Sequence, residues 1–264
     1  MNFKYRSIFI SDVHLGTKEV QNACLLDFLS RVDAEFIYLV GDIVDFWKLK
    51  KNWYWPEINN DIVQRLLEKV RKGTKVTYIP GNHDERLRDY VGSNLNGVLI
   101  GQDAIHTTWD NKKLLLIHGD EFDSVVMSNK WLVHFGDWLY ENIIVLNRYY
   151  NFLRRKLGFP YWSLSNFLKM RARKAVQYIE NFENAVIHEA RRRGVDGVVC
   201  GHIHHPAVKQ VDGITYANTG DWVENCTAIV ENRNGQLEML CWASIHEQEI
   251  QRSPKLVTAA REAA

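Results

Sequence analysis

The stretch Tyr78-Ile79-Pro80-Gly81-Asn82-His83-Asp84 indicates both a fold class and a site. The apolar run Val76 to Ile79 is typical of a short buried strand, and Pro80-Gly81 is a turn signal that ends it. A carboxamide, an imidazole and a carboxylate follow at once. Because ligands of open α/β sheets collect beyond the carboxyl ends of strands, we expect this turn to line a functional site.

The same layout, an apolar run that ends in Asp, Asn or His, recurs four times along the chain. Apolar runs of this kind predict strands that are buried on both faces. We expect the polar residues after the five runs to form one site. The other four runs are Ser7 to Ile10 before Asp12 and His14, Phe36 to Val40 before Gly41-Asp42 and Asp45, Leu114 to Ile117 before His118-Gly119-Asp120, and Gly197 to Cys200 before Gly201-His202-Ile203-His204-His205.

Helical patterns separate the first three runs. Asn22 to Val32 and Asp61 to Arg71 carry apolar residues at helical spacing, and Asp61 is the predicted N-cap of the second helix. Strands that alternate with helices predict an α/β fold with a largely parallel sheet and right-handed crossovers.

The composition of the chain changes after Asp123, where aromatic and basic residues become interleaved. We predict a helical insertion over about residues 124–175, followed by a long helix from Val176 to Arg193. Three short strands of a second sheet are expected at the C-terminal end: Ile214 to Ala217, Thr227 to Glu231 and Gln236 to Trp242. Because no repeat or linker is visible, we predict one domain over residues 1–252 and a flexible tail over residues 253–264.

The bulk composition is that of an ordinary globular protein: 264 residues, 46% hydrophobic and 25% charged. The net charge of +1 does not favour nucleic acid as a partner. Four cysteines without CxxC spacing fit reduced thiols, no run approaches the ~20 apolar residues of a membrane span, and no signal peptide precedes the first strand. We therefore expect a cytoplasmic protein, with peripheral contact with the inner membrane left open.

Seven side chains are candidate metal ligands. Any one of them alone would more simply be a cap or a satisfied polar group, but five of the ten histidines follow predicted strands. Carboxylate, imidazole and carboxamide groups together suit a divalent metal such as Mn, Fe or Zn more than Ca or Mg, and seven ligands suit two ions ~3.5–4 Å apart. The candidate ligands are Asp12, His14, Asp42, Asn82, His118, His202 and His204.

His83 follows one candidate ligand without itself being needed as one. A histidine beside a phosphoryl group can protonate the leaving oxygen or stabilise its charge. Asp45 is the predicted partner that orients the His83 imidazole.

The five motifs resemble those of the calcineurin-like metallophosphoesterases. This resemblance implies a four-layer α/β/β/α sandwich of two mixed sheets with a dinuclear metal site at the strand ends. It implies one metal on Asp12, His14 and His204, another on Asn82, His118 and His202, and Asp42 bridging the two. It also implies that His83 and Asp45 form a catalytic pair. The motifs are Asp12-x-His14, Gly41-Asp42-x-x-Asp45, Gly81-Asn82-His83-Asp84, His118-Gly119-Asp120 and Gly201-His202-x-His204.

Within that superfamily, Ser11 to Gly16, Gly41 to Trp47 and the helical insertion look like the UDP-2,3-diacylglucosamine diphosphatases. Those enzymes cleave the pyrophosphate of a lipid A precursor into lipid X and UMP, commonly with Mn²⁺, and their insertion is a lid over the acyl chains. The resemblance implies a nucleotide-lipid substrate. The residues expected to bind it are Asn82, Asp123, Arg171, Arg173 and Lys174.

Other interpretations stay open at this point. His83 and His205 stand where the best-known diphosphatases have arginine, which favours a related phosphodiesterase or phosphatase with another substrate. In that alternative the insertion is a contact of a homodimer, and the basic residues near Arg171 form a solvated helix face. A third alternative is a scaffold that kept the fold without catalysis.

Overall fold

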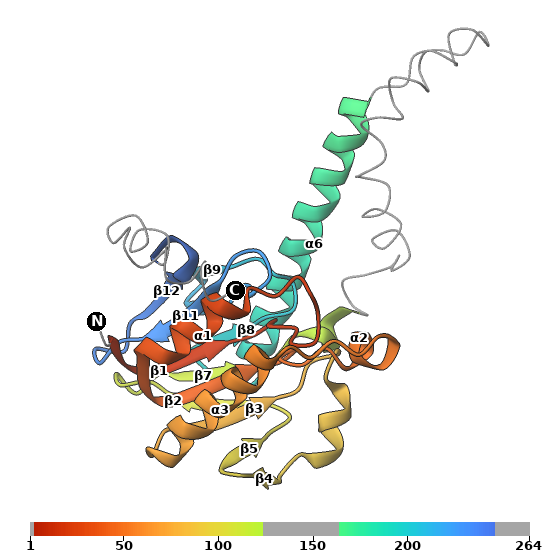
Figure 1. Ribbon diagram of the computed structural model, residues 1–264. Helices are drawn as coiled ribbons and strands as arrows, with labels where there is room; N and C mark the ends of the chain where they lie inside the picture. The colour runs from red at the N-terminus through yellow and green to blue at the C-terminus, as the bar shows by residue number, and fades with distance from the viewer. Residues whose placement is uncertain (1–2, 124–163, 246–264) are drawn as a thin grey trace, which may run out of the picture. The chain divides into compact units, whose positions relative to one another are not determined.

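The computed structural model describes the backbone of residues 3–123 and 164–245, and the side chains of residues 5–123 and 175–245. The chain forms two compact units, one of Met1–Glu121 with Val186–Ala264 and one of Phe122–Ala185. Every strand among the described residues belongs to the first unit (Figure 1). The predicted tail and most of the predicted insertion lie outside the described residues, so the proposed domain boundaries stay predictions.

The larger sheet has seven strands. Four neighbouring strands, β1, β2, β3 and β5, run parallel, and antiparallel strands extend the sheet at both sides. The register pairs Ile8 with Ile37 and Ile37 with Val76. In spatial order the strands are β12 (Leu237–Cys241), β11 (Thr227–Glu231), β1 (Phe3–Ile10), β2 (Val32–Val40), β3 (Lys75–Ile79), β5 (Val98–Ile100) and β4 (Asn94–Leu95).

The smaller sheet has five strands, of which β7, β8 and β10 are parallel. The prediction that three C-terminal strands share a second sheet was wrong in part. Only the first of them, β10, lies here, while β11 and β12 extend the larger sheet. The pattern of side chains along a strand does not specify its neighbour, and β11 pairs with β1 through Ser7 and Glu231. The spatial order is β6 (Ala104–Thr107), β7 (Lys113–Leu116), β8 (Gly197–Cys200), β10 (Ile214–Asn218) and β9 (Ala207–Val211).

Helices α1, α3 and α6 follow the predicted patterns, with two corrected starts. Helix α3 begins at Glu57 because Pro56 holds the preceding turn in an extended conformation, so Asp61 lies inside the helix and is not its N-cap. Helix α6 begins at Leu164, since no Gly or Pro interrupts the sequence before Val176, and it ends before Gly194, which has φ +65°. The helices are α1 (Asn22–Arg31), α2 (Phe46–Lys51), α3 (Glu57–Arg71) and α6 (Leu164–Arg192), with short 3₁₀ turns η1 (Glu85–Tyr90) and η2 (Asp120–Phe122).

The first unit has layers around two hydrophobic clusters. Helices α1 and α3 lie over one face of the larger sheet (Figure 1), where Ile8, Ile10 and Phe28 are buried in one cluster. Phe9, which points to the opposite face of β1, packs with Leu116 of β7 in the second cluster, between the sheets. Two mixed sheets with flanking helices confirm the predicted α/β sandwich.

The described residues include no helix that is long and apolar enough to span a membrane. The four cysteines are free thiols. Cys24, Cys200 and Cys226 are buried, whereas Cys241 is exposed.

Candidate metal centre

Backbone hydrogen bonds join the turns that follow the parallel strands. The Asp12 amide donates to the Gly41 carbonyl at 3.0 Å, and the His14 amide donates to the Asp42 carbonyl at 2.9 Å. In the smaller sheet the Gly201 amide donates to the His118 carbonyl at 3.1 Å. These bonds fix the positions from which the predicted ligands project.

The backbone of these turns is unusual. Five of the seven predicted ligands have a positive φ, in the left-handed region that residues other than glycine rarely adopt. Such residues cluster at functional sites, where the surrounding structure holds them in place. The five angles are 50° at Asp12, 55° at His14, 55° at Asp42, 72° at His202 and 52° at His204.

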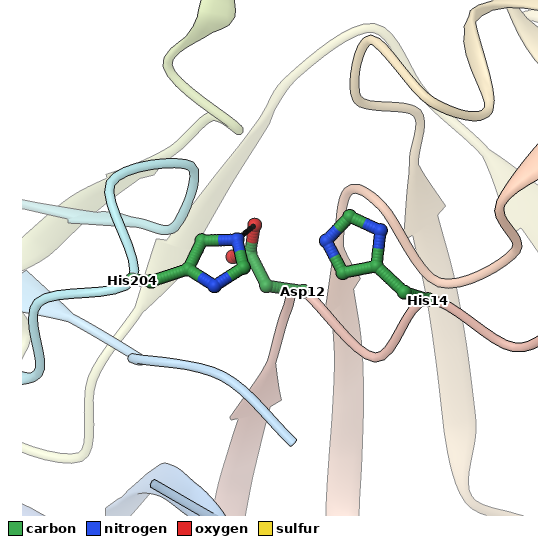
Figure 2. Close-up of side chains that lie close together, drawn as sticks. All are labelled: Asp12, His14 and His204. Atoms are coloured by element: carbon green, nitrogen blue, oxygen red, sulfur yellow. Dashed lines mark ion pairs between the residues drawn. The ribbon is translucent and has the colours of Figure 1, made fainter. Parts of the chain in front are cut away.

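Acidic and histidine side chains converge in three overlapping groups of three residues. Within each group, the possible ligand atoms lie within 4.8 Å of one another. Figure 2 shows one group, in which the His204 and His14 rings lie on opposite sides of Asp12. The His204 Nε2 atom is 3.2 Å from Asp12 Oδ1. The other groups share members with the first and join all three into one centre. Those groups are Asp12, Asp42 and His118, and His14, Asp45 and His83.

Three histidines present Nε2 to the inner carboxylates and have an oxygen atom on the side of Nδ1, which is hydrogen-bonded in His118. His118 Nδ1 donates to the Val40 carbonyl at 2.9 Å, and Nε2 is then 3.4 Å from Asp42 Oδ2. His14 Nδ1 lies 3.4 Å from Asp45 Oδ2, and His204 Nδ1 lies 3.8 Å from Asp221 Oδ2. An oxygen at one ring nitrogen is the usual arrangement that fixes a metal-binding histidine.

Several inner atoms are buried without a hydrogen-bond partner, although buried polar groups nearly always have one. These atoms are Asp12 Oδ1, His14 Nε2, Asn82 Oδ1 and His118 Nε2. Oxygen and imidazole nitrogen atoms of this kind are the donors that a divalent transition metal takes. The residues therefore fit the metal ions that the sequence implies.

Glycines at the strand ends leave room for the inner side chains. A Cβ atom at Gly81 would lie 2.3 Å from Asp42 Oδ1 and 2.7 Å from His118 Nε2. A Cβ atom at Gly201 would lie 2.4 Å from Asp12 Oδ2. Any side chain at either position would therefore displace a predicted ligand.

The electrostatic balance of the centre favours cations. Burial opposes ionisation of Asp12, but the His204 ring beside it and the nearby charge of His118 outweigh burial and lower the pKa of the carboxyl group. Burial likewise opposes the charged form of His118, yet Asp42 and Asp12 outweigh it and raise the pKa of this imidazole well above its ordinary value. The same balance lowers the pKa of Asp42 and raises that of His204. The inner carboxylates therefore stay ionised, which favours the binding of a divalent cation beside them.

His83 lies at the side of this centre. Its Nδ1 is 2.9 Å from Asp45 Oδ2, and its ring packs on Trp47 with 4.3 Å between the ring centroids. Burial disfavours the imidazolium, but the hydrogen bond to Asp45 and the charge of Asp42 outweigh it and raise the pKa of His83. The ring is thus held in one orientation with Nε2 facing Asp42, which suits a proton donor.

Asp84 has a positional role that the sequence reasoning did not assign. Its carboxylate accepts the amides of Ile43 at 2.8 Å and Gly81 at 2.5 Å, and the Tyr78 hydroxyl at 2.5 Å. It therefore ties the turn that carries Asp42 to the turn that carries Asn82. Its place directly after His83 was the available signal.

Asp221 was also missed. It accepts the amides of Val223 at 2.8 Å and Glu224 at 2.6 Å, and it lies beside the His204 ring. The carboxylate follows strand β10, as the predicted ligands follow other strands, and that position could have drawn attention to it.

The remaining predicted residues are placed less completely. The His202 amide donates to Asp12 Oδ2 at 3.0 Å, and the His202 ring lies 5.2 Å from that of His118. Asp123 belongs to the second unit, where it accepts the Tyr178 hydroxyl at 3.2 Å. Arg171, Arg173 and Lys174 lie on α6, but their side chains are outside the described residues, so their assignment as substrate-binding residues stays a prediction.

Two mixed sheets with acidic, amide and imidazole groups at their strand ends define a metallophosphoesterase. The sequence model of the calcineurin-like phosphoesterase family matches residues 5–206 of this chain. The chain therefore belongs to that family. The protein is therefore a hydrolase of a family that uses divalent metal ions, as predicted from its motifs.

Curated relatives agree with this placement. A protein of Haemophilus influenzae (strain PittGG) named UDP-2,3-diacylglucosamine hydrolase is 26% identical over 239 residues, which cover 85% of this chain and 94% of the relative. A protein of the same name from Photorhabdus laumondii is 25% identical, over 78% of this chain and 84% of the relative. Among solved structures, Vacuolar Protein Sorting 29 from Cryptosporidium parvum is 14% identical with a TM-score of 0.41, over 89% of this chain and 94% of the other.

Proposed function

We propose that the chain hydrolyses the pyrophosphate bond of a nucleotide-activated lipid. The substrate we infer is UDP-2,3-diacylglucosamine, which would give 2,3-diacylglucosamine 1-phosphate (lipid X) and UMP in lipid A biosynthesis. The observation that carries the proposal is the buried cluster of donor atoms without hydrogen-bond partners at the strand ends. The names of the relatives support the choice of substrate. Free thiols fit a reducing compartment, and we infer a cytoplasmic enzyme that reaches its substrate at the inner membrane.

Two divalent ions, with Mn²⁺ as our first choice and Fe or Zn as alternatives, are the proposed cofactors. We assign Asp12, His14 and His204 to one ion and Asn82, His118 and His202 to the other, with Asp42 shared. When bound, such a pair supplies an acidified water and neutralises charge on a phosphoryl group.

The proposed reaction forms a bond from a water oxygen to the α-phosphorus and breaks the bond from that phosphorus to the bridging oxygen. The electron pair of the broken bond leaves with the lipid phosphate. We assign to His83 the role of donating a proton or hydrogen bond from Nε2 to the departing oxygen. Asp45 accepts from Nδ1 at 2.9 Å and holds the ring for that task.

A second candidate is a phosphodiesterase or phosphatase of the same superfamily with another substrate. The observation in its favour is the His83–Asp45 pair, since histidine replaces the arginine of the best-known diphosphatases. In this alternative the insertion after Asp123 serves as a homodimer contact.

One assay separates the two candidates. Purified protein loaded with Mn²⁺ is given UDP-2,3-diacylglucosamine in detergent micelles, and products are identified by mass spectrometry in ¹⁸O-labelled water. We expect UMP and the lipid phosphate, with ¹⁸O in the UMP. Turnover of bis(p-nitrophenyl) phosphate without release of UMP would reject the lipid substrate and support the second candidate.

A further inference from the structure

A cluster of tryptophan and lysine residues follows Asp45 directly. Between Asp45 and Glu57 the sequence is FWKLKKNWYWP, with five aromatic residues, three lysines and no acidic residue. We call Trp47, Lys48, Lys50, Lys51 and Trp53 the Trp–Lys surface.

Local structure explains why these side chains face outward. Asp45 caps α2 by accepting the Lys48 amide at 2.8 Å, and Leu49 is the buried residue of this six-residue helix. Leu49 packs beside Gly16, where an added Cβ atom would lie 2.6 Å from the Leu49 Cγ. With Leu49 turned inward, the tryptophan and the lysines of the helix are left at the surface.

The exposure of the tryptophans is high. Trp53 is 75% exposed, the largest value among the exposed large hydrophobic side chains of the described residues, and Trp47 is 50% exposed. Trp53 lies 6.4 Å from Trp55 between ring centroids, and Lys18 Nζ lies 5.8 Å from the Tyr54 ring. Exposed aromatic residues that gather in this way mark an interaction site.

Lys48, Lys50 and Lys51 are exposed, and none of them forms an ion pair with another described residue. Lys18 adds a further cation, with its Nζ 5.8 Å from the centroid of the Tyr54 ring. An anionic partner would therefore find several free ammonium groups beside two exposed indole rings.

We propose that the Trp–Lys surface docks the protein on an anionic lipid bilayer. Indole rings are favoured at the level of lipid headgroups, and lysines are attracted to anionic lipid. The surface adjoins the candidate active site, because Trp47 packs on His83 and Asp45 caps the helix. This inference deepens the proposed function, on which it rests in one respect: a lipid-linked substrate resides in such a bilayer.

Single-stranded nucleic acid also combines stacking with positive charge, but it fits less well. Its binding sites track a backbone along an extended basic groove, whereas here the lysines lie within one short helix and the chain carries a net charge of only +1. Nucleic acid is therefore an outcome of the test and not the proposal.

The test is sedimentation of the full chain with sucrose-loaded vesicles. Phosphatidylcholine vesicles with about 30% phosphatidylglycerol are compared with pure phosphatidylcholine vesicles at low and high salt. We expect binding to the anionic vesicles only, with release at high salt. Trp53→Ala and the double substitution Lys50→Glu with Lys51→Glu should each lower the partition coefficient roughly tenfold.

Matched controls lie elsewhere on the same unit. Trp109→Ala removes another exposed tryptophan, which is 56% exposed. Lys72→Glu with Lys75→Glu makes the same charge change near the amino end of β3, whereas the candidate site lies beyond its carboxyl end. Both should bind within about twofold of the wild type, since neither touches the Trp–Lys surface. Thermal melts of all variants establish that each is folded.

Three results would overturn the inference: no binding of the wild type to anionic vesicles, equal loss in controls and test variants, or binding of an oligothymidylate in place of vesicles that is lost in the test variants. The proposed function has its own readout in the micelle assay. Absence of wild-type binding to anionic vesicles, with UMP release intact, would reject the proposed docking surface alone. Vesicle binding that follows the expected pattern without UMP release would reject the substrate alone.

Discussion

Asp42 is the residue on which both proposed metal positions depend. Its Oδ1 accepts the His83 amide at 2.8 Å, and its Oδ2 lies 3.4 Å from His118 Nε2 and 3.9 Å from His14 Nε2. We therefore expect Asp42 to act as a metal ligand, whereas His83, at the side of the centre, is expected to act as a proton donor.

Substitution should resolve these two roles. We expect Asp42→Ala to abolish turnover of bis(p-nitrophenyl) phosphate and most metal binding. His83→Ala should lower kcat by about 10²–10⁴-fold while keeping the metal, because it removes a proton donor and no ligand. Metal content is measured by plasma mass spectrometry beside kcat. His188→Ala, an exposed histidine on α6, is the control, and equal metal loss in Asp42→Ala and His83→Ala would contradict the assigned roles.

The pKa directions predict how metal binding depends on pH. An imidazole must lose its proton to bind a metal, and His118 and His204 both have a raised pKa. As pH falls through those raised values, protons compete with the metal, so affinity should weaken toward acid and binding should release protons. Calorimetry in two buffers of different ionisation enthalpy measures that release. An affinity that stays constant between about pH 5.5 and 8 would contradict the prediction.

Among the elements, the turn after β3 leaves little space for a larger side chain at Gly81. Gly81 does not have a positive φ, so an alanine there is limited by space and not by backbone conformation. Its Cβ would meet Asp42 and His118, both of which are buried.

Gly81→Ala should therefore weaken metal binding by at least tenfold, since two predicted ligands must move. Isothermal titration with Mn²⁺ is the measurement. Gly73→Ala is the matched control: a Cβ there meets nothing within 4 Å, so only the strain of its φ of +97° remains, a loss of about 1 kcal/mol of stability with unchanged metal affinity. Equal metal affinity in both variants would show that the turn adapts.

The elements also show what the sequence could predict. Strands β1, β2, β3, β7 and β8 were found because their apolar runs end in polar residues, and those ends located the candidate site. Strand β9 was missed because none of its residues is buried and its pattern is weak. Helix α2 was missed because six residues are too few for helical periodicity. The sheet assignment of β11 depends on its pairing with β1, in which Ser7 faces Glu231 far along the chain, and not on local pattern.

At the scale of the molecule, a buried polar network joins the two sheets of the first unit. His106 of β6 lies 2.7 Å from Glu231 of β11 and 3.0 Å from Tyr38 of β2, and Ser7 of β1 donates to Glu231 at 2.7 Å. All four side chains are buried. The network crosses from the smaller sheet to the larger one and therefore fixes their mutual position.

Glu231→Gln should destabilise the protein by about 1.5–3 kcal/mol at neutral pH, because it removes the charge of a buried carboxylate that accepts hydrogen bonds from the Ser7 hydroxyl and the Trp109 amide. Burial opposes ionisation of Glu231, but hydrogen bonds from His106, Ser7 and the Trp109 amide outweigh it and lower its pKa. A lowered pKa contributes stability above the ordinary value near 4.5, and that contribution is lost as pH falls toward the folded-state value.

Urea unfolding at several pH values measures this linkage. The wild type should lose stability toward acid more steeply than Glu231→Gln, so the two curves converge at low pH. The control is Glu35→Gln, an exposed carboxylate, which should change stability by less than about 0.5 kcal/mol. Parallel curves for wild type and Glu231→Gln would contradict the assignment.

The left-handed backbone at five predicted ligands has a consequence for laboratory evolution. At each of these positions, glycine or asparagine would adopt the positive φ with less backbone strain than the present residue. A library selected for heat tolerance alone would therefore collect such replacements at Asp12, His14 and His202. Its most robust survivors would be inert proteins, and screening must retain catalysis in every round.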